Sequence, residues 1–189
     1  MSLVSFNKYR QQLLVLSFLF FCLAVPVQAA TLKFIPESKN FGVGQEFMVD
    51  VKVDTADASI NAAQATVQFP KGVLQLLSVD RQASAFGFWV EDPVISNEAG
   101  TLQFIGGSAK GISGKSLQIL KMKFKASGTG VAEITASDAA VTSNDGNGTN
   151  VLETIEPASV VVGTKGITPP LQTIQTTSNP PPQLPHQFP

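Results

Sequence analysis

Cysteine and histidine are almost absent from this chain, and their scarcity excludes several kinds of chemistry. The 189 residues include one cysteine, Cys22, and one histidine, His186. Cys22 lies in an apolar segment near the N-terminus, so the rest of the chain has neither a disulfide nor a cysteine-based metal site. His186 lies in a proline-rich segment near the other end. Most hydrolytic mechanisms built on histidine, a thiolate or a histidine-bound metal are therefore excluded.

Charge is also scarce, and the charged residues do not converge on a reaction. Only 14% of the residues are charged and the formal net charge is −1. No basic patch indicates a nucleic-acid partner. Glu91 and Asp92 are adjacent, so on a strand they point to opposite faces and cannot form a glycosidase pair. Because no acid, base and nucleophile come together, we expect a protein that is not an enzyme.

The N-terminal segment has the three-part pattern of a secretory signal peptide. Residues 1–12 are polar and basic, residues 13–25 are apolar, and small residues follow. An apolar run of this length would be roughly 20 Å long as a helix, against about 30 Å of bilayer hydrocarbon, so it is not a stable membrane span. We place the cleavage between Ala29 and Ala30, which makes residues 1–29 the signal peptide. An uncleaved N-terminal anchor is the alternative, and both interpretations place the domain outside the cell or at its surface.

The C-terminal segment has a composition that cannot bury a core. Seven of the chain's twelve prolines fall in residues 169–189, among threonine, glutamine and serine. Such a composition favours extended, disordered conformations. Residues 164–189 are therefore interpreted as a proline-rich linker or tail.

The part between these segments shows the alternation of β-strands. From residue 120 to residue 126, apolar side chains alternate with lysines, the pattern of a strand with one buried face. About nine such segments and no amphipathic helix predict an all-β fold, a nine-stranded antiparallel β-sandwich over residues 30–163. The lysines in this segment form a basic stripe, which either steers an acidic partner or is simply the solvent face of a strand: Lys121, Lys123 and Lys125.

Several strand and turn motifs occur in a characteristic order. They are Gly44-Gln-Glu-Phe-x-Val-x-Val, Ala63-x-Ala-x-Val-x-Phe-Pro-x-x-Val-Leu, Gly100-Thr-Leu-x-Phe-x-Gly, Gly111-x-x-Gly, Leu120-x-Met-x-Phe-x-Ala and Asn144-Asp-Gly-x-Gly-Thr-Asn. Their order and spacing resemble the cohesin domain, the secreted β-sandwich module of cellulosomes and of cohesin-like surface proteins. The resemblance extends from about Ala30 to Val162. It implies a jelly-roll-like sandwich that acts as a secreted, non-catalytic recognition or scaffolding module in an extracellular polysaccharide-degrading or cell-surface assembly.

The resemblance also implies a partner and a face that binds it. In cohesins one flat sheet face receives dockerin, a calcium-loaded helical module. Gln64 falls where that family often carries an asparagine or aspartate contact, while Pro70 replaces an acidic contact common at the following corner. The candidate contacts to a dockerin-like protein share the outward side of the predicted strands: Gln64, Thr66, Gln68 and Gln103.

Two other kinds of function remain as alternatives. Phe86, Phe88 and Trp89 offer an aromatic platform for a sugar ring, which would make the chain a carbohydrate-binding module with a polysaccharide as its partner. The same rings would otherwise cap one end of the sandwich core. A structural surface stalk without a soluble ligand is the remaining alternative.

The turn that begins at Asp145 has the spacing of a calcium loop. Oxygen-bearing residues stand at the first, third, fifth, ninth and twelfth positions of the pattern: Asp145, Asn147, Thr149, Glu153 and Glu156. Against this, the sixth position is Asn150 rather than glycine, and Asp-Gly and Asn-Gly are ordinary turn dipeptides. We therefore expect no cofactor, with calcium as the one metal that the pattern allows.

Overall fold

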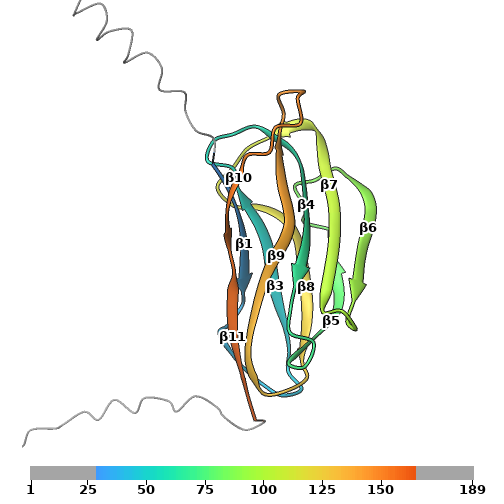
Figure 1. Ribbon diagram of the computed structural model, residues 1–189, viewed down its shortest axis with the longest axis vertical. Helices are drawn as coiled ribbons and strands as arrows, with labels where there is room; N and C mark the ends of the chain where they lie inside the picture. The colour runs from blue at the N-terminus through green and yellow to red at the C-terminus, as the bar shows by residue number, and fades with distance from the viewer. Residues whose placement is uncertain (1–28, 165–189) are drawn as a thin grey trace, which may run out of the picture.

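A computed structural model describes residues 29–164 of the chain, which form eleven β-strands and no helix (Figure 1). The predicted signal peptide and proline-rich tail lie almost wholly outside these residues. In the part that the structure describes, no helix is long and apolar enough to cross a membrane. The strands are β1 (Ala30–Pro36), β2 (Asn40–Gly42), β3 (Glu46–Asp54), β4 (Ile60–Gln68), β5 (Leu74–Asp80), β6 (Phe88–Ser96), β7 (Thr101–Ile112), β8 (Leu117–Ala126), β9 (Gly130–Ser143), β10 (Leu152–Glu156) and β11 (Ala158–Gly163).

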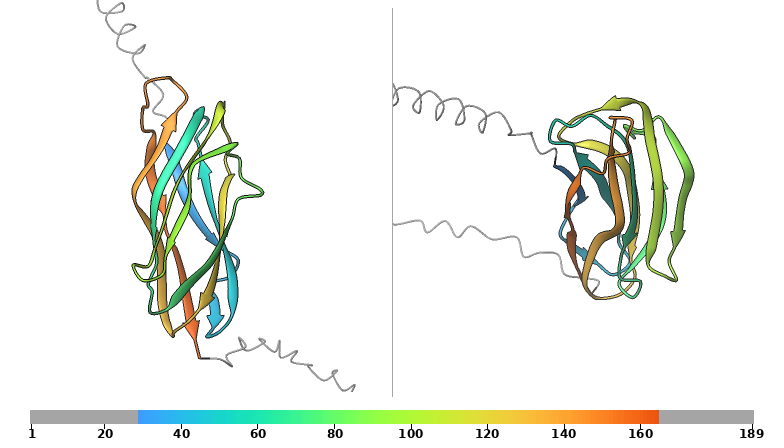
Figure 2. Two further views of the ribbon diagram at one scale, coloured as in Figure 1. Left: turned by 90° about the vertical axis from the view of Figure 1, so that its right-hand side faces the viewer. Right: turned by 45° about the horizontal axis from the view of Figure 1, so that its top comes forward.

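The strands form two sheets that pack face to face. One sheet has five strands in the order β10-β1-β3-β8-β5, and the other has six in the order β2-β11-β9-β4-β7-β6. Figure 2 shows the two layers from the side and obliquely, with the top brought forward. The predicted all-β sandwich is thus confirmed.

The strand count and pairing differ in detail from the expected nine antiparallel strands. The two additional strands, β2 and β10, arise where the chain passes from one sheet to the other. β10 belongs to the five-stranded sheet, and after Pro157 the chain continues as β11 of the six-stranded sheet. In the same way, β1 belongs to the five-stranded sheet and the following strand, β2, belongs to the six-stranded sheet. These crossings create two parallel pairs, β1 with β10 and β11 with β2. Segments so short carry too little alternation to be recognised in the sequence.

The core lies between the sheets and is built by the inward side of each strand. On β8 the apolar residues of the alternating segment are fully buried: Leu120, Met122, Phe124 and Ala126. The ring of Phe124 packs against two other phenylalanines, with its centroid 5.8 Å from that of Phe47 and 5.2 Å from that of Phe69. Every strand of the sandwich lies within residues 30–163, so this segment contains one complete core.

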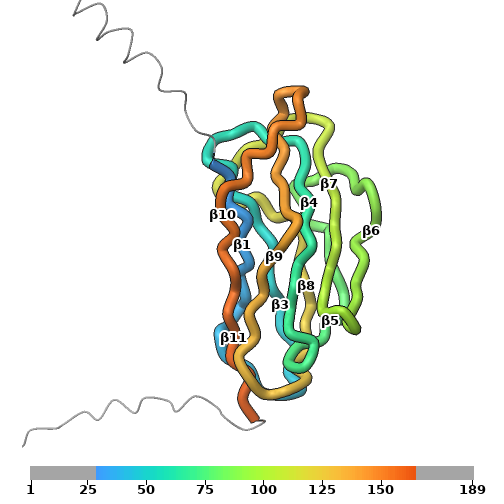
Figure 3. Tube along the Cα trace, viewed as in Figure 1, coloured from blue at the N-terminus to red at the C-terminus, as the bar shows by residue number. Residues whose placement is uncertain are grey.

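The start of β1 and the end of β11 lie at opposite ends of the long axis. In the tube drawing, β1 begins at the upper end of the sandwich, whereas β11 finishes at the lower end (Figure 3). The turn between β9 and β10 projects at the upper end. The outer face of β4, β7 and β9 lies between these ends, along the middle of the molecule.

Candidate functional site

The four predicted partner contacts lie on one face, the outer side of the six-stranded sheet. On β4 the even-numbered residues from Gln64 to Gln68 point outward because Ala63, Ala65 and Val67 are buried. Thr66 lies opposite Gln103 on the neighbouring strand β7. The alternation of β4 continues without interruption through this segment, which is why the sequence could place these side chains on a common face.

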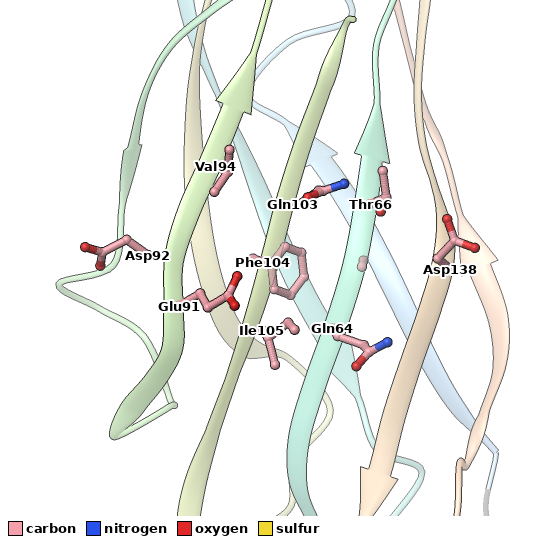
Figure 4. Close-up of a pocket in the computed structure, with 10 residues that line it drawn as sticks. Gln64, Thr66, Glu91, Asp92, Val94, Gln103, Phe104, Ile105 and Asp138 are labelled. Atoms are coloured by element: carbon pink, nitrogen blue, oxygen red, sulfur yellow. The ribbon is translucent and has the colours of Figure 1, made fainter.

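A shallow hollow of about 130 Å³ lies between β6 and β9 on this face (Figure 4). Its lining combines amides, carboxylates and apolar side chains: Gln64, Ala65, Thr66, Glu91, Asp92, Val94, Gln103, Phe104, Ile105 and Asp138. Gln68 lies beyond it, in a second depression beside Pro70 and Val131. Three of the four predicted contacts therefore share the hollow and the fourth lies further along the same strand.

The centre of the hollow is apolar. Val94 of β6 is 54% exposed and pairs with Gln103, and Ile105 pairs with Glu91 on one side and with Gln64 on the other. The sequence analysis did not identify Val94 or Ile105 as part of the site. For Val94 the reason is that β6 has two register shifts, between Trp89 and Glu91 and between Glu91 and Val94, which interrupt the alternation. Ile105 follows the alternation of β7 and shares the outward side with Gln103, so the signal for it was present in the sequence.

Asp138 reaches the hollow because β9 carries a bulge. Gln64 pairs with Ala140 and Thr66 with Ser137, so three residue steps on β9 oppose two on β4. Asp138 has a φ of 48°, the left-handed conformation that aspartate and asparagine adopt more readily than other residues. Figure 4 shows its carboxylate on the β9 side of the hollow.

A chain of hydrogen bonds runs along the outer face to Asp138. The side-chain amide of Gln68 donates from Nε2 to the Ser137 hydroxyl at 3.1 Å, and that hydroxyl donates to Asp138 Oδ2 at 3.2 Å. The chain holds Gln68 and Asp138 in a defined relation across two strands. These bonds use the side-chain N–H of Gln68 and the hydroxyl of Ser137 as donors, and they leave acceptor oxygens of Gln68 and Asp138 on the face.

On the β6 side, the neighbouring carboxylates Glu91 and Asp92 have different surroundings. Asp92 Oδ1 accepts a hydrogen bond from Arg81 Nη1 at 2.8 Å. The guanidinium of Arg81 also lies 5.2 Å from the ring of Trp89, a cation–π distance. Glu91 turns toward Ile105 in the hollow (Figure 4).

The three aromatic residues considered as a sugar platform do not lie on one exposed surface. Phe86 is 6% exposed, and its ring centroid is 6.0 Å from that of Trp89 at an angle of 65°. Trp89 in turn packs edge to face on the buried ring of Phe104. Phe88 is 46% exposed, and its ring lies over Gly107. Two of the rings therefore belong to the core, and only Phe88 is available at the surface.

The predicted calcium-loop residues do not converge either. The hydroxyl of Thr149 donates to Asp145 Oδ2 at 2.6 Å and the backbone N–H of Asn147 donates to Oδ1 at 2.8 Å, and these bonds lower the pKa of Asp145. Glu156 lies at the far end of β10, about 13 Å along the strand from its first residue, and pairs with Lys33 at 3.4 Å. Among residues 29–164, no group of three or more histidine, cysteine or acidic side chains is placed to hold a metal ion.

The lysine stripe lies in the middle of the opposite sheet, where acidic residues surround it. β8 has β3 on one side and β5 on the other, so it is not an edge strand. Lys123 contacts Glu46 at 2.7 Å and Lys121 contacts Asp50 at 3.7 Å. The Lys123 ammonium, as hydrogen-bond donor and as charge, lowers the pKa of Glu46. The stripe is thus largely neutralised by its own sheet.

Comparison with known proteins identifies relatives of this fold. The model of the cohesin domain family matches residues 33–162. No curated protein sequence matches the chain. The structure is similar to a cohesin module from a family 33 glycoside hydrolase of Clostridium perfringens, with a TM-score of 0.56, 16% identity, and coverage of 75% of this chain and all of the other.

Two further solved structures show the same likeness. A non-cellulosomal cohesin from the archaeon Archaeoglobus fulgidus has a TM-score of 0.58 and 16% identity, covering 73% of this chain and 94% of the other. The cohesin of a type I cohesin–dockerin complex from Clostridium thermocellum has a TM-score of 0.60 and 10% identity, covering 72% and 95%. At these identities the likeness concerns the fold.

Proposed function

This chain belongs to the cohesin domain family, and on that premise we propose that it is a non-catalytic module that binds a protein partner of the dockerin kind. The observation that carries the proposal is the outer face of β4, β6, β7 and β9. It is exposed, and amide side chains lie around its apolar centre. Protein interfaces commonly have this arrangement of an apolar centre within a polar rim.

The contacts that we propose are the outward amides and hydroxyl of β4 and β7. Gln64, Thr66 and Gln103 line the hollow, and Gln68 extends the same row toward Pro70. A rigid sheet presents these groups with little loss of conformational freedom on binding, which favours affinity. Val94 and Ile105 would contribute the buried apolar contact at the centre.

We also propose that the module acts outside the cell or at its surface. Residues 1–29 have the pattern of a secretory signal peptide. The family relation fits an extracellular assembly, since one similar structure is a cohesin module of a glycoside hydrolase. N-terminal sequencing of the exported protein is expected to begin at Ala30, and an intact leader on exported protein would contradict the cleavage.

A binding experiment tests the proposed partner. The chain from residue 30 onward, which contains the whole sandwich, is immobilised and exposed to a panel of calcium-loaded dockerin modules, among them the dockerin of the Clostridium thermocellum complex. We expect at least one member to bind with a Kd of about 1 μM or below, equivalent to roughly 8 kcal/mol. Absence of binding by every folded member would contradict a partner of this kind.

Variants test the proposed face. The double substitution Gln64→Ala and Gln68→Ala is expected to weaken binding about tenfold or more, because it removes two side-chain amides from the contact row. Gln75→Ala is the matched control, since Gln75 is an exposed glutamine on β5 of the other sheet. Full affinity in the double variant would exclude this face as the contact surface.

A further inference from the structure

The turn between β9 and β10 contains the one asparagine of the whole sequence that is followed by glycine, Asn147. Residues 144–149 of this turn are all exposed, and the turn projects beyond the end of the sandwich (Figure 3). None of them lines the hollow or the second depression. The turn is therefore open to water and lies apart from the proposed binding face.

The peptide group between Asn147 and Gly148 forms no hydrogen bond within residues 29–164. Other groups hold the turn: the Ser143 N–H donates to the Thr149 carbonyl at 2.8 Å, and the Asn147 N–H donates to Asp145 Oδ1 at 2.8 Å. Gly148 has a φ of 73°, and a Cβ atom there would meet nothing within 4 Å. This peptide group can therefore rotate without breaking a hydrogen bond.

The side-chain amide of Asn147 is not engaged either. Neither its Oδ1 nor its Nδ2 bonds to a residue that the structure describes. By contrast, Asn150 Oδ1 accepts the N–H groups of Val141 and Leu152 at 3.1 Å each, and both ends of the Asn97 amide are hydrogen-bonded. Asn147 thus differs from these asparagines both in its unbonded amide and in the glycine that follows it.

An asparagine followed by glycine can lose ammonia without an enzyme. The Gly148 nitrogen attacks Asn147 Cγ, and as this bond forms the Cγ–Nδ2 bond breaks. Ammonia leaves with the proton that the Gly148 nitrogen gives up, and a five-membered imide remains. Water then opens the imide at one of its two carbonyls, which yields aspartate or isoaspartate. A side chain on the attacking residue would hinder the approach, and glycine has none.

From these features we infer that Asn147 is a site of spontaneous deamidation in the folded protein, with the Gly148 nitrogen as nucleophile. The inference is independent of the proposed function. Asp145 is also followed by glycine, but its carboxylate accepts hydrogen bonds from the Thr149 hydroxyl and the Asn147 N–H. These bonds lower its pKa and keep it ionised, and an ionised carboxylate is a poor target for a nucleophile. The turn therefore reacts at one of its two Asx-Gly sequences.

The product changes the charge of the turn and leaves the strands in place. The bonds that join the turn to the sheet are made by Ser143, Val141 and Asn150, outside the reacting peptide group. The tip gains a second carboxylate two residues from Asp145, and isoaspartate also adds one methylene to the backbone. The fraction of this more acidic form therefore records how long a molecule of the protein has existed.

Timed incubation of the protein tests the inference. The chain from residue 30 onward, which contains the whole sandwich, is kept at mildly alkaline pH beside the end-blocked peptide Asp-Gly-Asn-Gly-Thr, and mass spectrometry follows the replacement of the amide by a carboxyl group at residue 147. We expect the two rates to agree within about threefold, roughly 0.6 kcal/mol in the activation barrier. A folded chain that reacts about tenfold more slowly than the peptide would overturn the inference, because the turn would then protect its amide.

Two glycine variants identify the nucleophile. Gly148→Asn is expected to slow deamidation at residue 147 about tenfold or more, since the added side chain hinders the nitrogen. Asparagine accepts the left-handed backbone there, so the turn is kept. Gly146→Asn is the matched control: Gly146 has a φ of 77° and equally open surroundings but precedes the reacting residue, so its rate should stay within about twofold of the parent. An undiminished rate in Gly148→Asn, or reaction of Asn97 or Asn150 as fast as that of Asn147, would contradict the inference.

Discussion

The side-chain amide of Asn97 takes the place of a neighbouring strand beside Leu76. Its Oδ1 accepts a hydrogen bond from the Leu76 N–H at 2.8 Å, and its Nδ2 donates to the Leu76 carbonyl at 2.8 Å. Leu76 lies on β5, the edge of the five-stranded sheet, and Asn97 directly follows β6, the edge of the other sheet. One side chain therefore joins the two sheets on the side of the sandwich next to the hollow.

We expect Asn97→Ala to lower the free energy of unfolding by about 1–3 kcal/mol, because it leaves two partly buried backbone groups of Leu76 without partners. Urea denaturation measures the change. Gln75→Ala, on the same strand but exposed, is the control and is expected to remain within about 0.5 kcal/mol of the parent. Equal stabilities of the two variants would show that the amide contributes nothing at this edge.

Gly107 allows β7 to approach β4 beside the hollow. A Cβ atom at this position would overlap the backbone oxygen of Asn61 and lie 3.1 Å from the Phe88 ring. We expect Gly107→Ala to destabilise the fold by about 1–3 kcal/mol, since a strand backbone cannot shift cheaply. Gly87→Ala is the matched control, because a Cβ there meets no atom within 4 Å. A neutral Gly107→Ala in chemical denaturation would contradict the close approach.

The pKa of Asp145 reports on the turn between β9 and β10. The Thr149 hydroxyl is the main cause of its lowering from the ordinary value of 3.8. A lowered pKa means that the group's contribution to stability is present above 3.8 and is lost as the pH falls through the folded-state value. We expect Thr149→Val to raise the pKa toward 3.8 and Thr149→Ser to keep it low, as followed by carboxyl-carbon NMR. An unchanged pKa in Thr149→Val would show that the hydroxyl is not the donor.

Trp89 provides an optical test of the aromatic residues. Its ring packs against Phe86 and Phe104 and is covered by Arg81, so its fluorescence is expected to be blue-shifted. Arg81→Ala should move the emission toward longer wavelength by exposing the ring to water. Soluble cello-oligosaccharides should leave the parent emission unchanged. A saturable change on adding them would instead favour carbohydrate binding at this end of the sandwich.

The sequence alone predicts a strand and its buried side correctly wherever apolar and polar residues alternate without interruption. β3, β4 and β8 keep one side buried along most of their length, and the outward position of Gln64, Thr66 and Gln68 follows from that alternation alone. Family resemblance supplied the jelly-roll-like arrangement and the choice of face. Local pattern and global fold agree in these elements, which is typical of sequences that specify one structure.

The other residues of the site are placed by bulges and register shifts, which the alternation of buried and exposed residues in the sequence does not reveal. β9 is a single strand of fourteen residues, and its bulge at Asp138 shifts the alternation by one residue. The two register shifts of β6 hide Val94 and Glu91 in the same way. Glu156 matched the calcium pattern by spacing along the chain, but an extended strand carries it away from the turn. Each of these positions is set by pairing with a distant strand, which local sequence does not encode.

The start of β1 and the end of β11 lie at opposite ends of the long axis, and this arrangement has a mechanical consequence. Tension applied through the two ends of residues 29–164 would run along the strands, as Figure 1 shows. β1 is bonded to β3 on one side and to β10 on the other, and such a load would strain these bonds together rather than one after another. A sandwich loaded in this direction resists extension by shear. Such a geometry is expected to need a higher unfolding force than one in which the bonds of the terminal strands break one at a time.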